Sequence, residues 1–191
     1  NYYIINNGAD EHIFNLYLRK FLLKKKRKFW SPHDKFKLLI VSWSSNQMKG
    51  FKEYDSIDKS YNLENAEIKF VGNLPASIKF KKIISLKPQP KKKLAKIYKN
   101  SHALLFLGKY ETCSNTITEA INCGLPIIYE DSGSNSEVVK NCGIPYSGFL
   151  KKDLEFIKSN YSNLIDNCRN RDLKISSVAP KYEKIIERYL V

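Results

Sequence analysis

The sequence has few cysteines and no metal-binding cysteine spacing. The four are Cys113, Cys123, Cys142 and Cys168, and no two of them form a C-x-x-C pair. Neither a zinc site nor a disulfide framework is indicated, so we expect reduced thiols. Cys123 and Cys142 lie among apolar or turn residues, where a cysteine is expected to pack as a small buried hydrophobe.

Long apolar runs are also absent from the sequence. No run approaches the roughly 20 residues that cross a bilayer, and the N-terminus lacks the layout of a signal peptide. We therefore expect a soluble, cytoplasmic domain. The chain starts at Asn1 without a Met, and residues 2–5 read as an apolar strand that begins abruptly. These features predict a piece of a longer protein.

Acidic residues are outnumbered by basic ones. The chain has 33 Lys and Arg against 19 Asp and Glu, a formal net charge of +14. Such a field attracts nucleotides, nucleic acids and anionic lipids, so a basic nucleic-acid-binding module or a non-catalytic nucleotide-binding module remains an alternative. The densest basic run, residues 24–28, could rest peripherally on an anionic membrane or be a solvated helix end.

The apolar residues follow an alternating pattern. With 42% hydrophobic residues in 191, the chain can build one core, which predicts a single domain. Apolar bursts alternate with amphipathic stretches, as in strands and helices around a parallel sheet. The predicted strands are 36–43, 68–71, 83–86, 103–107 and 126–129. The predicted helices are 51–61, 94–98, a short one starting at the capping box 134–137, a long one over 150–168, and 182–190.

This pattern predicts an α/β domain with a doubly wound, Rossmann-like parallel sheet. We divide it into a linker and first-helix region (1–34), a core (35–175) and a C-terminal helix (176–191). Ligands of such sheets bind beyond the carboxyl ends of the strands. The loops expected to meet there are 42–50, 72–73, 88–90, 108–115 and 131–136.

Two carboxylates, Glu111 and Glu119, bracket the most informative stretch. In one continuous helix they would lie about 80° and two turns apart, so one of them must precede the helix. Ser114, Asn115 and Thr116 are good N-cap residues, which places Glu111 in a loop and Glu119 in the first or second turn. The free amides between them can bind phosphate, and the carboxylates can accept hydrogen bonds from sugar hydroxyls. Alternatively, 116–119 is only a capping box and Glu111 an ordinary loop acid.

Six motifs occur in a characteristic order. They are Asn6-Asn7-Gly8-Ala9-Asp10 followed by Phe14, Trp43-Ser44-Ser45-Asn46-Gln47-Met48-Lys49-Gly50-Phe51, Val71-Gly72-Asn73, Leu94-Ala95-Lys96-Ile97-Tyr98 before Ala103, the stretch 111–126 with its E-x7-E spacing, and the turn 133–137. This order resembles the C-terminal, donor-binding domain of retaining GT-B glycosyltransferases, most closely glycosyltransferase family 4. The resemblance spans nearly the whole chain and implies the C-terminal half of a GT-B fold.

The resemblance implies transfer of a sugar from a UDP- or GDP-sugar to an unidentified saccharide, lipid or protein acceptor. It implies retained anomeric configuration, no catalytic metal and no cofactor. The acceptor-binding N-terminal domain would be covalently linked but absent from this chain, so the isolated domain is expected to be inactive or weakly active. Phosphorylases and epimerases share this architecture, but no lysine context here suggests a pyridoxal phosphate site.

The resemblance also assigns roles to residues. Glu111 would contact hydroxyls of the transferred sugar near the reacting carbon, and Glu119 would hold the ribose. Lys49 would neutralise the diphosphate leaving group, so Glu111 and Lys49 are the expected catalytic residues. The other expected donor-binding residues are Cys113, Ser114, Asn115, Thr116, Ser44, Asn46, Gly50, Asn73, Gln89 and Gly133.

One position departs from the family pattern. The family usually carries an Arg a few residues before the loop lysine, where this chain has Trp43-Ser44-Ser45-Asn46. The hydroxyl of Ser44 and the amide of Asn46 can donate hydrogen bonds to phosphate, but they bring no charge.

Overall fold

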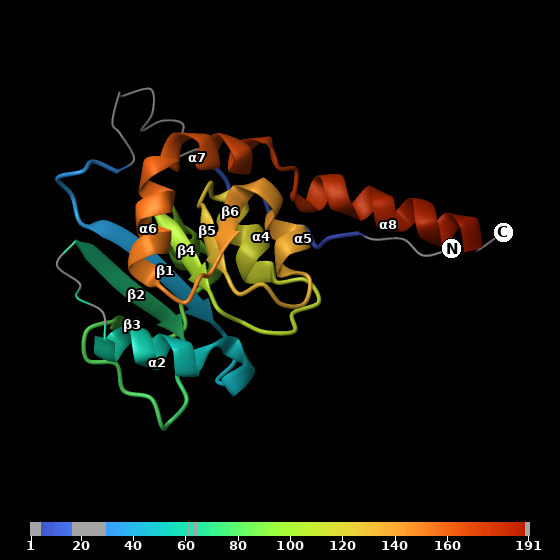
Figure 1. Cartoon of the computed structure of the whole chain (residues 1–191). Coiled ribbons are helices and arrows are strands. Elements are labelled where there is room, and N and C mark those ends of the chain that lie inside the picture. The colour runs from blue at the N-terminus through green and yellow to red at the C-terminus, as the bar shows by residue number, and fades with distance from the viewer. Residues whose placement is uncertain (1–4, 17–29, 61, 63–64, 190–191) are drawn as a thin grey trace.

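The strands of the molecule form one parallel sheet. The computed structural model describes residues 5–16, 30–60, 62 and 65–189. The sheet has six strands in the order β3-β2-β1-β4-β5-β6 (Figure 1). The strands are β1 (Phe36–Ser42), β2 (Ala66–Gly72), β3 (Ile84–Leu86), β4 (Ala103–Phe106), β5 (Ile127–Tyr129) and β6 (Gly143–Pro145). The chain winds outward from β1 to β3, returns to β4 beside β1, and winds outward again, which confirms the predicted doubly wound α/β class.

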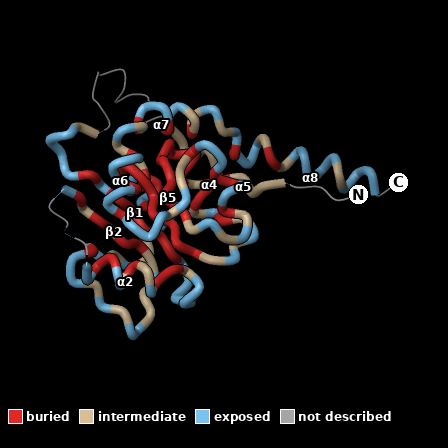
Figure 2. The backbone as a smooth tube through the Cα atoms, in the orientation of Figure 1, coloured by how far each residue is buried: buried red, intermediate tan, exposed pale blue. Residues whose placement is uncertain are grey.

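Helices cover both faces of this sheet, and its central strands β1, β4 and β5 are apolar and buried on both faces. Leu38 and Ile40 pack with residues of α2 (Phe51–Ser60), α6 (Leu150–Ser159) and α7 (Tyr161–Asn170). Leu39 and Val41 point the other way and pack with α3 (Lys91–Lys99), α4 (Asn115–Asn122) and α5 (Asn135–Val139). Figure 2 shows the buried residues concentrated along the strands and the inner sides of the helices.

The remaining elements are two short 3-10 helices and a projecting C-terminal helix. The 3-10 helices are η1 (Gln47–Lys49) and η2 (Lys140–Cys142). The last helix, α8 (Ile175–Tyr189), extends away from the body beside the N-terminal segment (Figure 1), and Val178 is its buried residue. Among the helices described, none combines the length and the apolar character needed to cross a bilayer.

One element predicted from the sequence is wrong, and one strand was not predicted. The long helix expected over 150–168 is two helices, α6 and α7, separated at Asn160. The apolar spacing continues through this break because Ile157 and Tyr161, on either side of it, pack into the same core cluster. The edge strand β6 was not predicted, since its three residues include Gly143 and Pro145 and form no apolar run.

Two further predictions fall on parts of the chain outside the described residues. They are the apolar strand at 2–5, of which only Ile5 is described, and the basic run 24–28. The burial of Cys123 and Cys142 agrees with their predicted packing role.

Candidate functional site

The candidate site begins where the winding of the sheet reverses. β1 and β4 are neighbours, β1 leads to α2 on one face, and β4 leads to α4 on the other. Loops that leave adjacent parallel strands toward opposite faces open a crevice at the carboxyl edge of the sheet. Two of the predicted ligand-binding loops therefore lie on the two sides of this crevice.

The two predicted catalytic residues meet across the crevice. Lys49 ends η1 after β1, Glu111 lies in the loop after β4, and Lys49 Nζ forms an ion pair with Glu111 Oε1. The side chains are 30% and 17% exposed, so the pair is accessible but partly shielded. A backbone hydrogen bond of 2.8 Å from Lys109 N to Met48 O joins the same two loops. Residues 62 positions apart in sequence are thereby held together.

The loop that carries Lys49 is shaped by its predicted polar residues and its glycine. Asn46 caps η1 through its side chain, and the hydroxyl of Ser44 accepts a hydrogen bond of 3.1 Å from the backbone nitrogen of Asn46. Gly50 then ends η1 with φ of +80°, and a Cβ atom there would overlap the carbonyl of Leu107. Only glycine satisfies both conditions, so the backbone next to Lys49 is fixed against β4.

The turn after β5 packs against the backbone of Glu111. The backbone nitrogen of Ser134 donates to Glu111 O at 2.8 Å. Gly133 has φ of +61°, and a Cβ atom there would lie 2.7 Å from the Glu111 nitrogen. Ser134 is the N-cap of α5 as predicted, but the capping box is wrong in detail, because its hydroxyl makes no capping bond and is buried without a partner. The contact of Ser134 with Glu111 is therefore made by the Ser134 backbone and not by its hydroxyl.

The N-terminus of α4 lies next to Glu111 in the chain. Ser114 is the N-cap, as one of the three predicted possibilities, and makes no side-chain capping bond. Asn7, from the N-terminal segment, donates through Nδ2 to Cys113 O at 3.2 Å and to Asn115 Oδ1 at 3.1 Å, and its backbone nitrogen contacts Cys113 Sγ at 3.1 Å. The loop that precedes α4 is therefore braced by a distant segment, while Ser114 leaves the first amides of α4 uncapped.

Glu119 lies in the second turn of α4 and faces α3. Its Oε2 accepts a hydrogen bond of 3.3 Å from the hydroxyl of Tyr98. Burial raises the pKa of Glu119 to about 7, against the opposing effects of the Tyr98 hydrogen bond and the charge of Lys91. A pKa raised this far is unusual for a glutamate, and such shifts are found preferentially at functional sites.

The other predicted side chains lie in two loops. Asn73 Nδ2 donates to Trp43 O at 2.6 Å, which ties the end of β2 to the Lys49 loop. Gln89 Nε2 donates to Lys87 O at 2.8 Å and so bonds within its own loop before α3. The structure thus links Asn73 to the crevice directly and Gln89 only through its position ahead of α3.

Two polar groups that follow β4 and β5 in the chain were not predicted, namely Lys109 and Asn135. Lys109 Nζ pairs with Glu53 at 2.8 Å and lies 4.0 Å from Glu130. The buried side chain of Asn135 donates to Gly108 O and Glu130 O, both at 2.9 Å. The contacts of Lys109 with Glu53 and of Asn135 with Gly108 join residues 56 and 27 positions apart, so a local sequence pattern does not reveal them. Within the described ranges, no three His, Cys, Asp or Glu side chains gather as they would around a metal ion.

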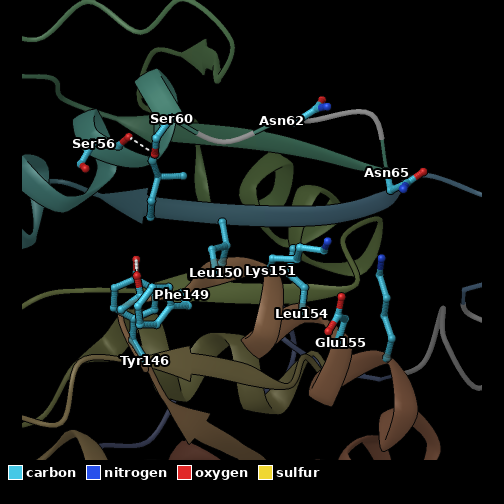
Figure 3. A pocket seen from close by; sticks show the side chains of 13 residues that line it. Ser56, Ser60, Asn62, Asn65, Tyr146, Phe149, Leu150, Lys151, Leu154 and Glu155 are labelled. Carbon is cyan, nitrogen blue, oxygen red and sulfur yellow. Dashed lines mark hydrogen bonds between the residues drawn. The ribbon is translucent and has the colours of Figure 1, made fainter.

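A separate groove lies between α2 and α6. It has a volume of about 540 Å³, with Ser56, Asn65, Phe149 and Glu155 among its lining residues (Figure 3). None of the predicted site residues lines it. The predicted site residues therefore lie at the carboxyl edge of the sheet and not in this groove.

The fold is a doubly wound α/β domain, and the Lys49–Glu111 pair lies at its switch point. The family model described as glycosyl transferases group 1 matches residues 19–155, more than half of the chain. The chain therefore belongs to the glycosyl transferases group 1 family. No curated protein matches it in sequence.

Solved glycosyltransferase structures share its fold. A sucrose-phosphate synthase from Thermosynechococcus elongatus superposes with a TM-score of 0.74 at 13% identity, covering 98% of this chain and 52% of that one. A glycosyltransferase from Rickettsia africae gives 0.71 at 15% identity, covering 98% and 57%. HepE from Anabaena, solved in complex with UDP-glucose, gives 0.70 at 13% identity, covering 97% and 57%. The chain thus spans about half the length of these structures, and the predicted C-terminal GT-B fold is confirmed.

Proposed function

We propose that this chain is the donor-binding domain of a retaining, metal-independent glycosyltransferase of the family 4 type. The donor is a UDP- or GDP-sugar, and the acceptor is a saccharide, lipid or protein held mainly by an N-terminal domain. The chain's span of about half of the similar structures supports a second domain in the full-length protein. The complex of HepE with UDP-glucose supports a nucleotide sugar as the class of donor.

The observation that carries this proposal is the Lys49–Glu111 pair at the switch point. A sugar–diphosphate bond leaves negative charge on the diphosphate as it breaks, and an adjacent ammonium group stabilises that charge. A carboxylate beside it can accept hydrogen bonds from the sugar hydroxyls. Lys49 forms an ion pair with Glu111, and a bound diphosphate would compete for the same ammonium group.

The surrounding groups support the remaining contacts of a donor. The uncapped N-terminus of α4 suits phosphate, because its amides and dipole favour an anion. Glu119 is assigned to the ribose hydroxyls, and the base is assigned to the loops that contain Asn73 and Gln89. In the Lys49 loop, Ser44 and Asn46 take the place of the guanidinium that the family usually carries.

Thermal unfolding with added nucleotides tests the proposal. UDP, GDP, UDP-glucose and GDP-mannose are titrated separately. We expect either the two uridine nucleotides or the two guanosine nucleotides to raise Tm toward a plateau as their concentration increases. Glu119→Ala should abolish the rise, whereas Glu155→Ala, an exposed carboxylate on α6, should retain it. The proposal fails if the wild type shows no saturable rise with any of the four, or if Glu119→Ala responds as the wild type does.

A further inference from the structure

Tyr98 lies directly against the carboxylate that is assigned to the ribose. Its side chain is fully buried on α3, and its hydroxyl lies 3.3 Å from Glu119 Oε2 and 3.4 Å from Thr116 O. We infer that Tyr98 is a positioning residue for nucleotide binding, whose hydroxyl holds Glu119 as an ionised acceptor for the ribose hydroxyls. This inference rests on the proposed function, because it needs Glu119 to contact a nucleotide.

The position of the Tyr98 hydroxyl is fixed by packing. The ring meets Phe14 edge-on, with centroids 5.9 Å apart and planes at 80°, inside the core cluster on the α3 and α4 face. A hydroxyl has one proton, so a bond to Glu119 competes with a bond to the carbonyl of Thr116. Both acceptors belong to the first two turns of α4. The hydroxyl therefore links α3 to the first two turns of α4.

The charge state of Glu119 depends on few neighbours. Burial disfavours its ionised form, while the hydroxyl of Tyr98 and the ammonium group of Lys91 favour it. An ionised carboxylate accepts hydrogen bonds from both ribose hydroxyls, whereas a protonated one has lost part of this capacity. Because the Tyr98 hydroxyl lowers the pKa of Glu119, we expect its removal to raise this pKa and to leave less of the accepting form at neutral pH.

Calorimetric titration of the chain with UDP-glucose and GDP-mannose between about pH 5.5 and about pH 9 tests this inference. The diphosphate of these probes is esterified at both ends, so it lacks the terminal phosphate that titrates near pH 6. Wild-type affinity should fall as the pH drops through about 7. Tyr98→Phe should bind about fivefold more weakly at neutral pH, recover at about pH 9, and show its midpoint at higher pH.

Two matched variants separate this role from a structural one. Tyr161→Phe removes another buried hydroxyl, which donates to His102 O at 3.1 Å ahead of β4, and it should leave the pH midpoint unchanged. Glu119→Gln carries no titratable group at this position, and adding Tyr98→Phe to it should cause no further loss of affinity.

The possible outcomes are distinct. A wild type that binds neither probe overturns the proposed function and this inference with it. The inference alone is overturned if the wild type binds a probe but Tyr98→Phe leaves the pH midpoint of binding unchanged. It is also overturned if Tyr98→Phe lowers the affinity equally at every pH. If Tyr98→Phe does not fold, the wild-type profile decides, because a flat affinity across this pH range excludes an ionisation-dependent Glu119.

Discussion

A single glycine permits the contact between the β5 turn and Glu111. Gly133 combines a positive φ of +61° with a site where a Cβ atom would overlap the Glu111 carbonyl oxygen. Alanine would meet both the strained backbone conformation and the steric overlap, so the turn and the Glu111 loop must move apart. We expect Gly133→Ala to lower the free energy of unfolding by about 2 kcal/mol or more. The variant should also weaken nucleotide-sugar binding, as measured by urea unfolding and calorimetry.

Gly148 provides the matched control for this prediction. It also has a positive φ, +86°, but nothing lies within 4 Å of a Cβ atom built there. Gly148→Ala should therefore cost only the conformational strain, about 1 kcal/mol, and leave nucleotide-sugar affinity unchanged. Equal effects of the two variants on affinity would argue against the contact with Glu111 as the cause.

At the scale of elements, one carboxylate joins α2 to the approach to β3. Asp58 on α2 is buried, and it accepts hydrogen bonds from the backbone nitrogens of Lys81, Lys82 and Ile83 at 2.7, 2.8 and 2.7 Å. Burial by itself would raise the pKa of Asp58, but these three donors lower it below the ordinary value. Asp58→Ala leaves the buried donors without a partner, so we expect a loss of about 3 kcal/mol in urea unfolding at neutral pH.

The pH dependence of this loss has a definite sign. Because the folded pKa of Asp58 is lowered, its stabilisation is fully present above the ordinary value of 3.8 and is lost as the pH falls through the folded value. The difference between wild type and Asp58→Ala should therefore shrink in acid. Asp55→Ala, which removes only an exposed pair with Lys59 on the same helix, should cost less than about 0.5 kcal/mol. A loss at Asp58 that is constant with pH would contradict this explanation.

The central strands β1, β4 and β5 could be predicted because they are buried on both faces. Apolar runs predicted five of the six strands with bounds that differ by a few residues from those observed. Strand β6 was not predicted, because Gly143 and Pro145 interrupt its apolar run. The break between α6 and α7 at Asn160 was not predicted, because the apolar spacing of α6 continues into α7. The periodicity of apolar residues thus indicates which face of an element is buried, but it does not indicate where the backbone hydrogen bonds of a helix end.

The candidate site could be predicted only in part. The resemblance indicated Lys49 and Glu111, and the structure places them in contact. The partners that hold the loops could not be foreseen, because Asn7 reaches Cys113 across 106 positions and Tyr98 reaches Glu119 across 21. Such contacts depend on how the elements pack, and a local pattern does not encode them.

At the scale of the whole molecule, the net charge of +14 differs from the local charge around Lys49 and Glu111. Lys49 is paired with Glu111, and Lys109 is paired with Glu53 and close to Glu130. These two lysines therefore contribute little net charge to the crevice. The binding of a nucleotide sugar should depend on directed contacts there, and the general attraction of anions should depend on the remaining lysines and arginines.

Salt separates the two kinds of binding. Raising NaCl from about 50 to about 500 mM should weaken UDP-glucose binding by less than about tenfold, because a single diphosphate displaces few counterions. Binding of a DNA duplex through the general field should fall by about a thousandfold or more, because many phosphates are neutralised together. Both affinities are measured by calorimetry or fluorescence anisotropy on the same preparation. A UDP-glucose affinity that falls as steeply as the DNA affinity would assign anion binding to the overall charge and favour a nucleic-acid-binding module over a nucleotide-sugar site.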